Sequence, residues 1–94
     1  SILFNAIKLR WAGKKLGFEK IVLKNNSLRA FFTTDKNSNY FESVDFKKIM
    51  NFLKENPKDC QIKENRGKLS LRKEGVMEIN QALELFNKLI NQKV

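Results

Sequence analysis

The hydrophobic positions between residues 3 and 16 repeat with a helical period, but they form two apolar arcs instead of one. At about 100° per residue, the first arc consists of small and aliphatic residues: Ala6, Leu9, Ala12, Gly13 and Leu16. The second arc carries larger side chains: Leu3, Phe4, Ile7 and Trp11. A helix on the surface of a globular domain needs only one apolar stripe. The second arc therefore predicts contact with a partner; the alternative is that it caps the core or contacts residues outside the sequence.

A hairpin is predicted directly after this helix. Gly17 readily adopts a positive φ, which is typical of the residue that follows a helix C-terminus. Residues 18–24 then read as a strand, Asn25-Asn26 as a tight turn, and residues 28–34 as the returning strand. Phe31 and Phe32 are consecutive in that strand and must point to opposite faces. One of the two rings is therefore expected in the core.

A second helix follows the polar loop of residues 35–39. Ser43 is a plausible N-cap, and Asp45 in the first turn suits the positive end of a helix. Apolar residues then recur at i, i+3, i+4 and i+7: Phe46, Ile49, Met50 and Leu53. Pro57 disfavours helical geometry at the residue before it, so this helix should end there.

The last third of the chain predicts another hairpin and a third helix. Cys60 and Ile62 alternate inward, residues 65–67 turn, and Leu69 and Leu71 alternate back. Residues 78–92 then form a helix with a broad apolar face: Ile79, Ala82, Leu83, Leu85, Phe86, Leu89 and Ile90. The order αββαββα predicts an α+β fold, with two antiparallel hairpins in one sheet covered by helices. Residues 1–94 contain no linker and read as a single domain.

The formal charge of +9 is concentrated in the first third of the chain. Residues 1–34 carry seven basic side chains and one acidic one, whereas residues 76–94 are balanced. Fifteen of the nineteen basic residues are Lys, and such a bias raises the isoelectric point without selection for binding. The first interpretation is thus a solvated Lys-rich surface. The alternative is an independent basic nucleic-acid-binding domain, with Lys8, Lys15, Lys20 and Lys24 on one face.

Candidate chemistry is scarce. The chain has no His, so it holds no Ser-His-Asp triad and no Cys-His pair, and its single cysteine, Cys60, forms no internal disulfide. Its carboxylates are scattered over loops and element ends, and its four glycines lack a phosphate-binding spacing. We therefore predict no catalytic, metal or cofactor-binding residues, and no enzyme activity for this chain.

No stretch approaches the roughly 20 apolar residues that span a bilayer. The first five residues lack the basic segment, apolar core and cleavage site of a signal peptide. A cysteine left unpaired suits a reducing compartment. The expected location is the bacterial cytoplasm, with no membrane partner.

Residues 6–21, AIKLRWAGKKLGFEKI, resemble a segment near the C-terminus of bacterial transcription-repair coupling factors. That family shows a basic amphipathic helix ending Lys-Leu-Gly-Ile, then a strand, a short turn and a strand ending in Phe. This chain has Leu16-Gly17-Phe18 and residues 28–31, LRAF, in the same order. The helix that opens at residues 44–45, VD, and ends with LKENP at residues 53–57 is similar to the next family helix, and residues 69–71, LSL, complete the match.

The resemblance implies the regulatory, autoinhibitory C-terminal domain of a larger protein. Such proteins are ATP-dependent DNA translocases that displace stalled RNA polymerase and recruit UvrA of nucleotide excision repair. Their C-terminal domain packs against their own N-terminal UvrB-like region. Double-stranded DNA, RNA polymerase, ATP and Mg²⁺ would then belong to the parent, with the motor upstream of this chain and no cofactor within it.

Two departures from the family bear on the interface. A charged stretch with Phe-Gly that forms part of the restraining contact would lie before Ser1, so the chain is interpreted as a trimmed fragment. Trp11 also stands where relatives tend to be polar. We expect the partner-binding face on the first helix: Phe4, Ile7, Lys8, Arg10, Trp11, Lys14 and Lys15.

Overall fold

The computed structural model of the protein describes residues 2–94, and it has the predicted αββαββα order. The first half comprises α1 (Ile2–Leu16), β1 (Lys20–Lys24), β2 (Ser27–Phe31) and a 3₁₀ helix η1 (Asn39–Glu42). The second half comprises α2 (Val44–Glu55), β3 (Gln61–Asn65), β4 (Lys68–Glu74) and α3 (Ile79–Ile90). The α+β prediction is confirmed.

The four strands form one antiparallel sheet in the order β1-β2-β4-β3. The two strands of each hairpin pair with each other, β1 with β2 and β3 with β4. Pairing of β2 with β4 joins the two hairpins at the centre of the sheet. Ala30 therefore lies beside Leu71 in the middle of the sheet, with Ile21 and Ile62 next to them on the two edge strands. This register places Ile21, Ala30, Leu71 and Ile62 on one face.

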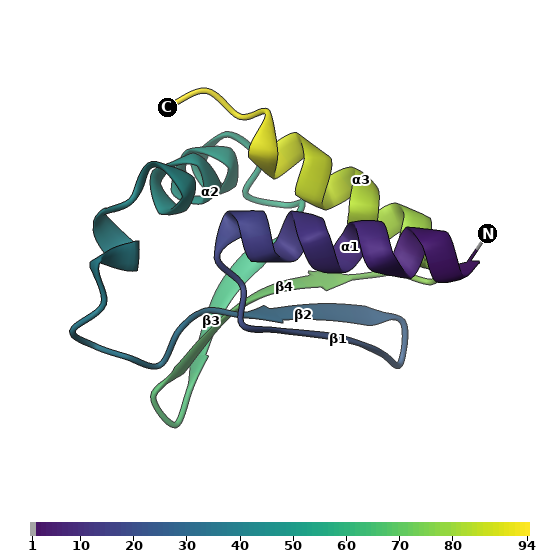
Figure 1. Cartoon of the computed structure of the whole chain (residues 1–94), viewed down its shortest axis with the longest axis horizontal. Helices are drawn as coiled ribbons and strands as arrows, with labels where there is room; N and C mark the ends of the chain where they lie inside the picture. The colour runs from purple at the N-terminus through teal and green to yellow at the C-terminus, as the bar shows by residue number, and fades with distance from the viewer. Residues whose placement is uncertain (1) are drawn as a thin grey trace.

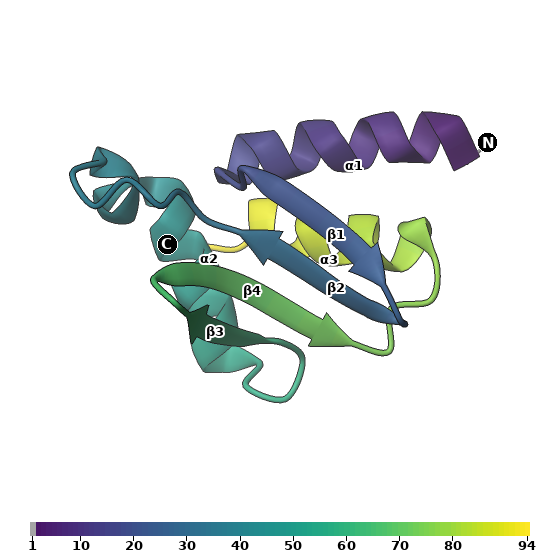
Figure 2. The same cartoon turned by 90° about the horizontal axis from the view of Figure 1, so that it is seen from below.

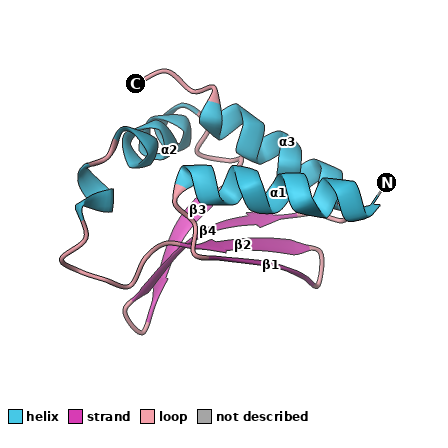
Figure 3. Ribbon diagram, in the orientation of Figure 1, coloured by secondary structure: helices cyan, strands magenta, loops and turns pink. Residues whose placement is uncertain are grey.

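Helices α1 and α3 lie side by side across that apolar face (Figure 1). Helix α2 contacts both of them (Figure 3) and passes behind β4 and β3 in the view from below (Figure 2). Seen from below, the second face of the sheet lies in front, with α3 behind the strands and α1 running along the β1 side (Figure 2). Among residues 2–94, no helix covers this second face of the sheet. The fold is therefore a two-layer α+β sandwich with one open sheet face.

Local sequence explains the sharp turns between these elements. Asn25 and Asn26 both have positive φ, 54° and 58°, as a two-residue hairpin turn that follows strand twist requires. Ser43 caps α2, because its Oγ accepts a hydrogen bond from the Phe46 amide at 3.2 Å. Gly17 ends α1 with φ 94°.

The core lies between the sheet and the three helices. Its largest fully buried side chains are Phe32, Phe86, Leu16, Leu28, Ile49, Leu71, Leu89 and Cys60. The Phe18 ring lies between Phe32 and Phe86, with centroid distances of 5.1 and 5.2 Å. Phe32 is the buried member of the Phe31-Phe32 pair, whereas Phe31 is only half-buried, as the alternation of a strand predicts.

The first hairpin is shorter than predicted, and η1 is an element that the sequence pattern did not indicate. Ser38 caps η1 through a hydrogen bond from the Tyr40 amide. The Tyr40 ring then packs against Phe32 and Phe46 at 5.9 and 5.6 Å, and its hydroxyl donates to the Leu16 carbonyl at 2.5 Å. This loop therefore closes the end of the core and fixes the C-terminus of α1.

Candidate interaction surface on the first helix

The outer side of α1 exposes a continuous apolar stripe, which we call the α1 stripe: Leu3, Phe4, Ile7 and Trp11. Leu3 and Trp11 are 73% and 75% exposed, and Phe4 and Ile7 are about half exposed. Most of the large, exposed hydrophobic side chains among the described residues belong to this helix. An exposed apolar cluster on a small domain is typical of a contact site.

The inner arc of α1 fixes the direction in which the stripe points. Leu9, Ala12 and Leu16 are buried in the core, so the opposite side of the helix must face outward. Gly13 allows a close approach to the sheet, because a Cβ atom there would overlap Cδ1 of Ile21. Near the start of the helix, the amide of Asn5 donates to Oδ1 of Asn80 at 2.6 Å. Packing and this hydrogen bond therefore hold α1 on α3 with its stripe exposed.

Basic side chains border the stripe on both sides. Lys8 and Lys15 are exposed on one side, and Lys8 places its Nζ 4.5 Å from the centre of the Phe4 ring. Arg10 and Lys14 lie on the other side, where they line a groove between α1 and the edge strand β1. The structure thus brings all seven predicted interface residues to one side of α1, with apolar residues in the middle and cations along the flanks.

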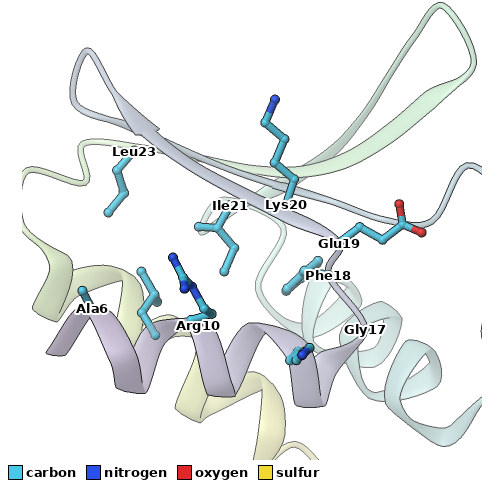
Figure 4. A pocket seen from close by; sticks show the side chains of 10 residues that line it. Ala6, Arg10, Gly17, Phe18, Glu19, Lys20, Ile21 and Leu23 are labelled. Atoms are coloured by element: carbon cyan, nitrogen blue, oxygen red, sulfur yellow. The ribbon is translucent and has the colours of Figure 1, made fainter. Parts of the chain in front are cut away.

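The groove beside β1 has a volume of about 750 Å³. Its lining combines Arg10 and Lys14 with apolar side chains of α1, of β1 and of the connection between them, including Leu9, Ile21 and Phe18. In Figure 4 Arg10 rises from α1 toward β1, whereas the Lys20 side chain points away from the helix. The groove therefore extends the basic border of the stripe toward the edge of the sheet.

The grouping of Lys8, Lys15, Lys20 and Lys24 on one face is wrong. Lys20 and Lys24 alternate with Ile21 and Leu23 along β1, and those two residues face the helices. The two lysines consequently lie on the open face of the sheet, while Lys8 and Lys15 lie on the outer side of α1. The sheet separates the two pairs.

Cys60 is buried and unpaired in the core. Burial and, to a smaller extent, the Asp59 carboxylate raise the pKa of its thiol, and the Lys73 ammonium offsets part of this rise. The net result is a pKa of about 11. Since the thiolate is the reactive form, this site suits packing and not nucleophilic chemistry. Burial also raises the pKa of Tyr40, with Asp45 adding to the effect.

Within residues 2–94, no group of three or more Cys, Asp or Glu side chains is placed to hold a metal ion. None of the helices described here is long and apolar enough to cross a bilayer.

Sequence reasoning missed the cations that strand pairing gathers on the open face. Arg29, Lys63 and Arg72 come from three different strands and are distant in the sequence. In each strand the cations occupy the polar positions that alternate with the core residues, and this alternation can be read from the sequence. Only the pairing of β2 with β4 shows that these positions are neighbours on one face.

Comparison of the chain with protein-family models, with curated proteins and with solved structures finds no match.

Proposed function

We propose that this chain is a protein-interaction domain of the regulatory type that ends transcription-repair coupling factors. In this proposal the α1 stripe and its basic border dock onto the UvrB-like region of the same parent translocase. The observation that carries the proposal is the exposure of Leu3, Phe4, Ile7 and Trp11 on a helix whose other side is fully used by the core.

The stripe can supply useful but limited binding energy. Fully burying an exposed large apolar side chain contributes about 1.5–3 kcal/mol. Phe4, Ile7 and Trp11 are 55%, 48% and 75% exposed, so covering their exposed parts contributes roughly 3–5 kcal/mol in total. Association of two separate molecules costs about 4–15 kcal/mol in lost freedom and ordering. Docking is thus expected to be weak between separate chains. It becomes strong within one chain, where a short tether gives an effective concentration in the millimolar range.

The basic border selects the chemistry of the partner surface. Lys8 and Lys15 on one flank, and Arg10 and Lys14 on the other, favour an apolar patch with an acidic rim. Complementary rim charges chiefly raise the association rate and exclude wrong partners. Release of such a contact would shift the parent from a closed to an open population, which is how a docked domain can restrain a motor.

Calorimetric titration of this chain with the UvrB-like region of a bacterial transcription-repair coupling factor tests the proposal. We expect measurable association at low salt. The variants Ile7→Ser and Trp11→Ser should each weaken it about tenfold or more, as is usual for central apolar contacts. Ile7 is 48% exposed and Trp11 is 75% exposed, so the substitutions should leave the fold intact.

Matched controls come from exposed apolar residues outside α1. Val44→Ser and Met77→Ser remove side chains that are 55% and 72% exposed on other parts of the surface. Both controls should bind like the unsubstituted chain. Equal weakening by control and stripe variants, or no association at low salt, would refute docking through α1.

A further inference from the structure

The open face of the sheet is built from the residues that alternate with the core positions of the four strands. It consists of Lys20, Val22, Lys24, Ser27, Arg29, Phe31, Gln61, Lys63, Asn65, Lys68, Ser70, Arg72 and Glu74. Six of these side chains are cationic, and only Glu74 is acidic. This face is therefore the most strongly charged surface of the sheet, and it lies on the opposite side from α1 (Figure 2).

Contacts between strands confirm that these side chains share one surface. The Lys20 ammonium lies over the Phe31 ring, 6.0 Å from its centre. On the neighbouring strands, Ser27 Oγ donates to Glu74 Oε1 at 3.5 Å, and Arg72 Nε lies 3.9 Å from the same carboxylate oxygen. The face is thus continuous from β1 through β2 to β4.

The centre of this face holds two arginines directly opposite each other. Arg29 on β2 is the register partner of Arg72 on β4. Like charges at such positions destabilise a sheet, and the single nearby carboxylate is too distant to form a hydrogen bond with Arg72 Nε. That Nε is buried and has no hydrogen-bond partner. An anion bound by the exposed Arg29 side chain and the accessible part of the Arg72 side chain, which is 30% exposed, would relieve the repulsion.

An apolar spot lies beside the arginines. Phe31 is half-buried at the centre of the row that runs Lys20, Phe31, Ser70 and Lys63 across the sheet. Val22 is diagonal to Phe31 on β1. Aromatic side chains on a sheet give unpaired bases a stacking platform.

We propose that the open face binds single-stranded nucleic acid, with phosphates on Arg29, Arg72 and the edge lysines and a base on Phe31. Four strands span three inter-strand spacings, about 14 Å, which exceeds the roughly 12 Å width of the DNA major groove. The whole face therefore cannot enter duplex DNA, whereas a flexible single strand can follow it. This site is independent of the α1 stripe and of the docking proposed for it.

Fluorescence anisotropy with a labelled oligothymidine of about 12 nucleotides, within the usual range of site sizes, tests the assignment. We expect binding at low salt, and log K should fall with log salt with a slope of about −2 to −3, as for three or four neutralised phosphates. Phe31→Leu, which keeps an apolar side chain, should weaken binding roughly tenfold because stacking is lost.

Charge-reversal variants on the two surfaces distinguish binding at the open face from attraction by the net charge of the chain alone. Arg29→Glu and Lys15→Glu change the charge of the chain equally, and both side chains are exposed. Arg29→Glu should weaken binding at least tenfold, and Lys15→Glu no more than about twofold, because Lys15 is on α1, on the other side of the sheet from the open face. Equal losses, or absence of binding at low salt, would overturn the proposal.

Competitors separate the chemical classes of ligand. Unlabelled oligothymidine should displace the probe, whereas a duplex of equal length and polyglutamate should compete much less well. Equal competition by the duplex would overturn the single-strand assignment. Equal competition by polyglutamate would show that the face binds an acidic polypeptide and would overturn the proposal as a whole. None of these results depends on the titration with the UvrB-like region.

Discussion

Substitution of Gly17 tests how α1 is fixed on the sheet. Gly17 has φ 94°, in the region that L side chains rarely adopt. A Cβ atom there would lie 2.7 Å from Cδ1 and Cζ of Tyr40 and closer still to Cε1. The Tyr40 ring cannot retreat easily, because its hydroxyl is bonded to the Leu16 carbonyl and its edge packs on Phe46.

Two separate costs therefore arise in Gly17→Ala. The left-handed backbone costs about 1–2 kcal/mol for a residue with a Cβ atom, and overpacking against the Tyr40 ring costs about 1–3 kcal/mol. Together they should lower the free energy of unfolding by roughly 2–5 kcal/mol. For a domain of this size that is a large part of the total stability.

Urea unfolding followed by circular dichroism measures this loss. Gly67→Ala is the matched control, since Gly67 also has a positive φ, 79°, but has open space where a Cβ atom would be placed. It should lose only the backbone cost, about 1–2 kcal/mol. Equal destabilisation of the two variants would refute the claim that Tyr40 seals the end of α1.

Three smaller changes probe other parts of the structure. Ser43→Ala removes the N-cap hydrogen bond of α2 and should lower the unfolding free energy by about 1 kcal/mol in urea titrations. Tyr40→Phe removes the donor to the Leu16 carbonyl and should cost about 1–2 kcal/mol in the same assay. Cys60 should resist iodoacetamide at pH 8 in the folded chain and react after unfolding, as mass spectrometry can follow, because its thiol is buried and its pKa is about 11. Folding raises this pKa from 9.0 to about 11, so deprotonation of the thiol favours the unfolded chain. The free energy of unfolding should therefore fall as the pH rises from about 9 to 11, and this fall should be smaller in Cys60→Ala.

The order of elements was predictable because its signals are local. The Asn25-Asn26 turn, the Ser43 cap and the stop before Pro57 each depend on a few neighbouring residues, and the structure has each of them. The exposure of the second apolar arc of α1 was also foreseeable, because a 3.6-residue period leaves it opposite Leu9.

Features that depend on distant contacts could not be predicted. The η1 turn exists because the Tyr40 ring reaches Phe32 and the end of α1, and no local pattern indicates those partners. The faces of Lys20 and Lys24 were assigned wrongly for a similar reason, since the side of the sheet that α1 covers is set by core packing. Likewise, the juxtaposition of Arg29 with Arg72 follows only from the pairing of the two hairpins.

Nuclear magnetic resonance of the ¹⁵N-labelled chain, titrated with the unlabelled UvrB-like region, would show residue by residue whether α1 is the docking surface. The chain is small enough for every backbone amide to be followed at once. We expect shifts or broadening along the outer side of α1, centred on Ile7 and Trp11, while amides of the open face, such as Arg29 and Lys63, remain unchanged. An undisturbed α1, or changes confined to the open face, would contradict docking through α1.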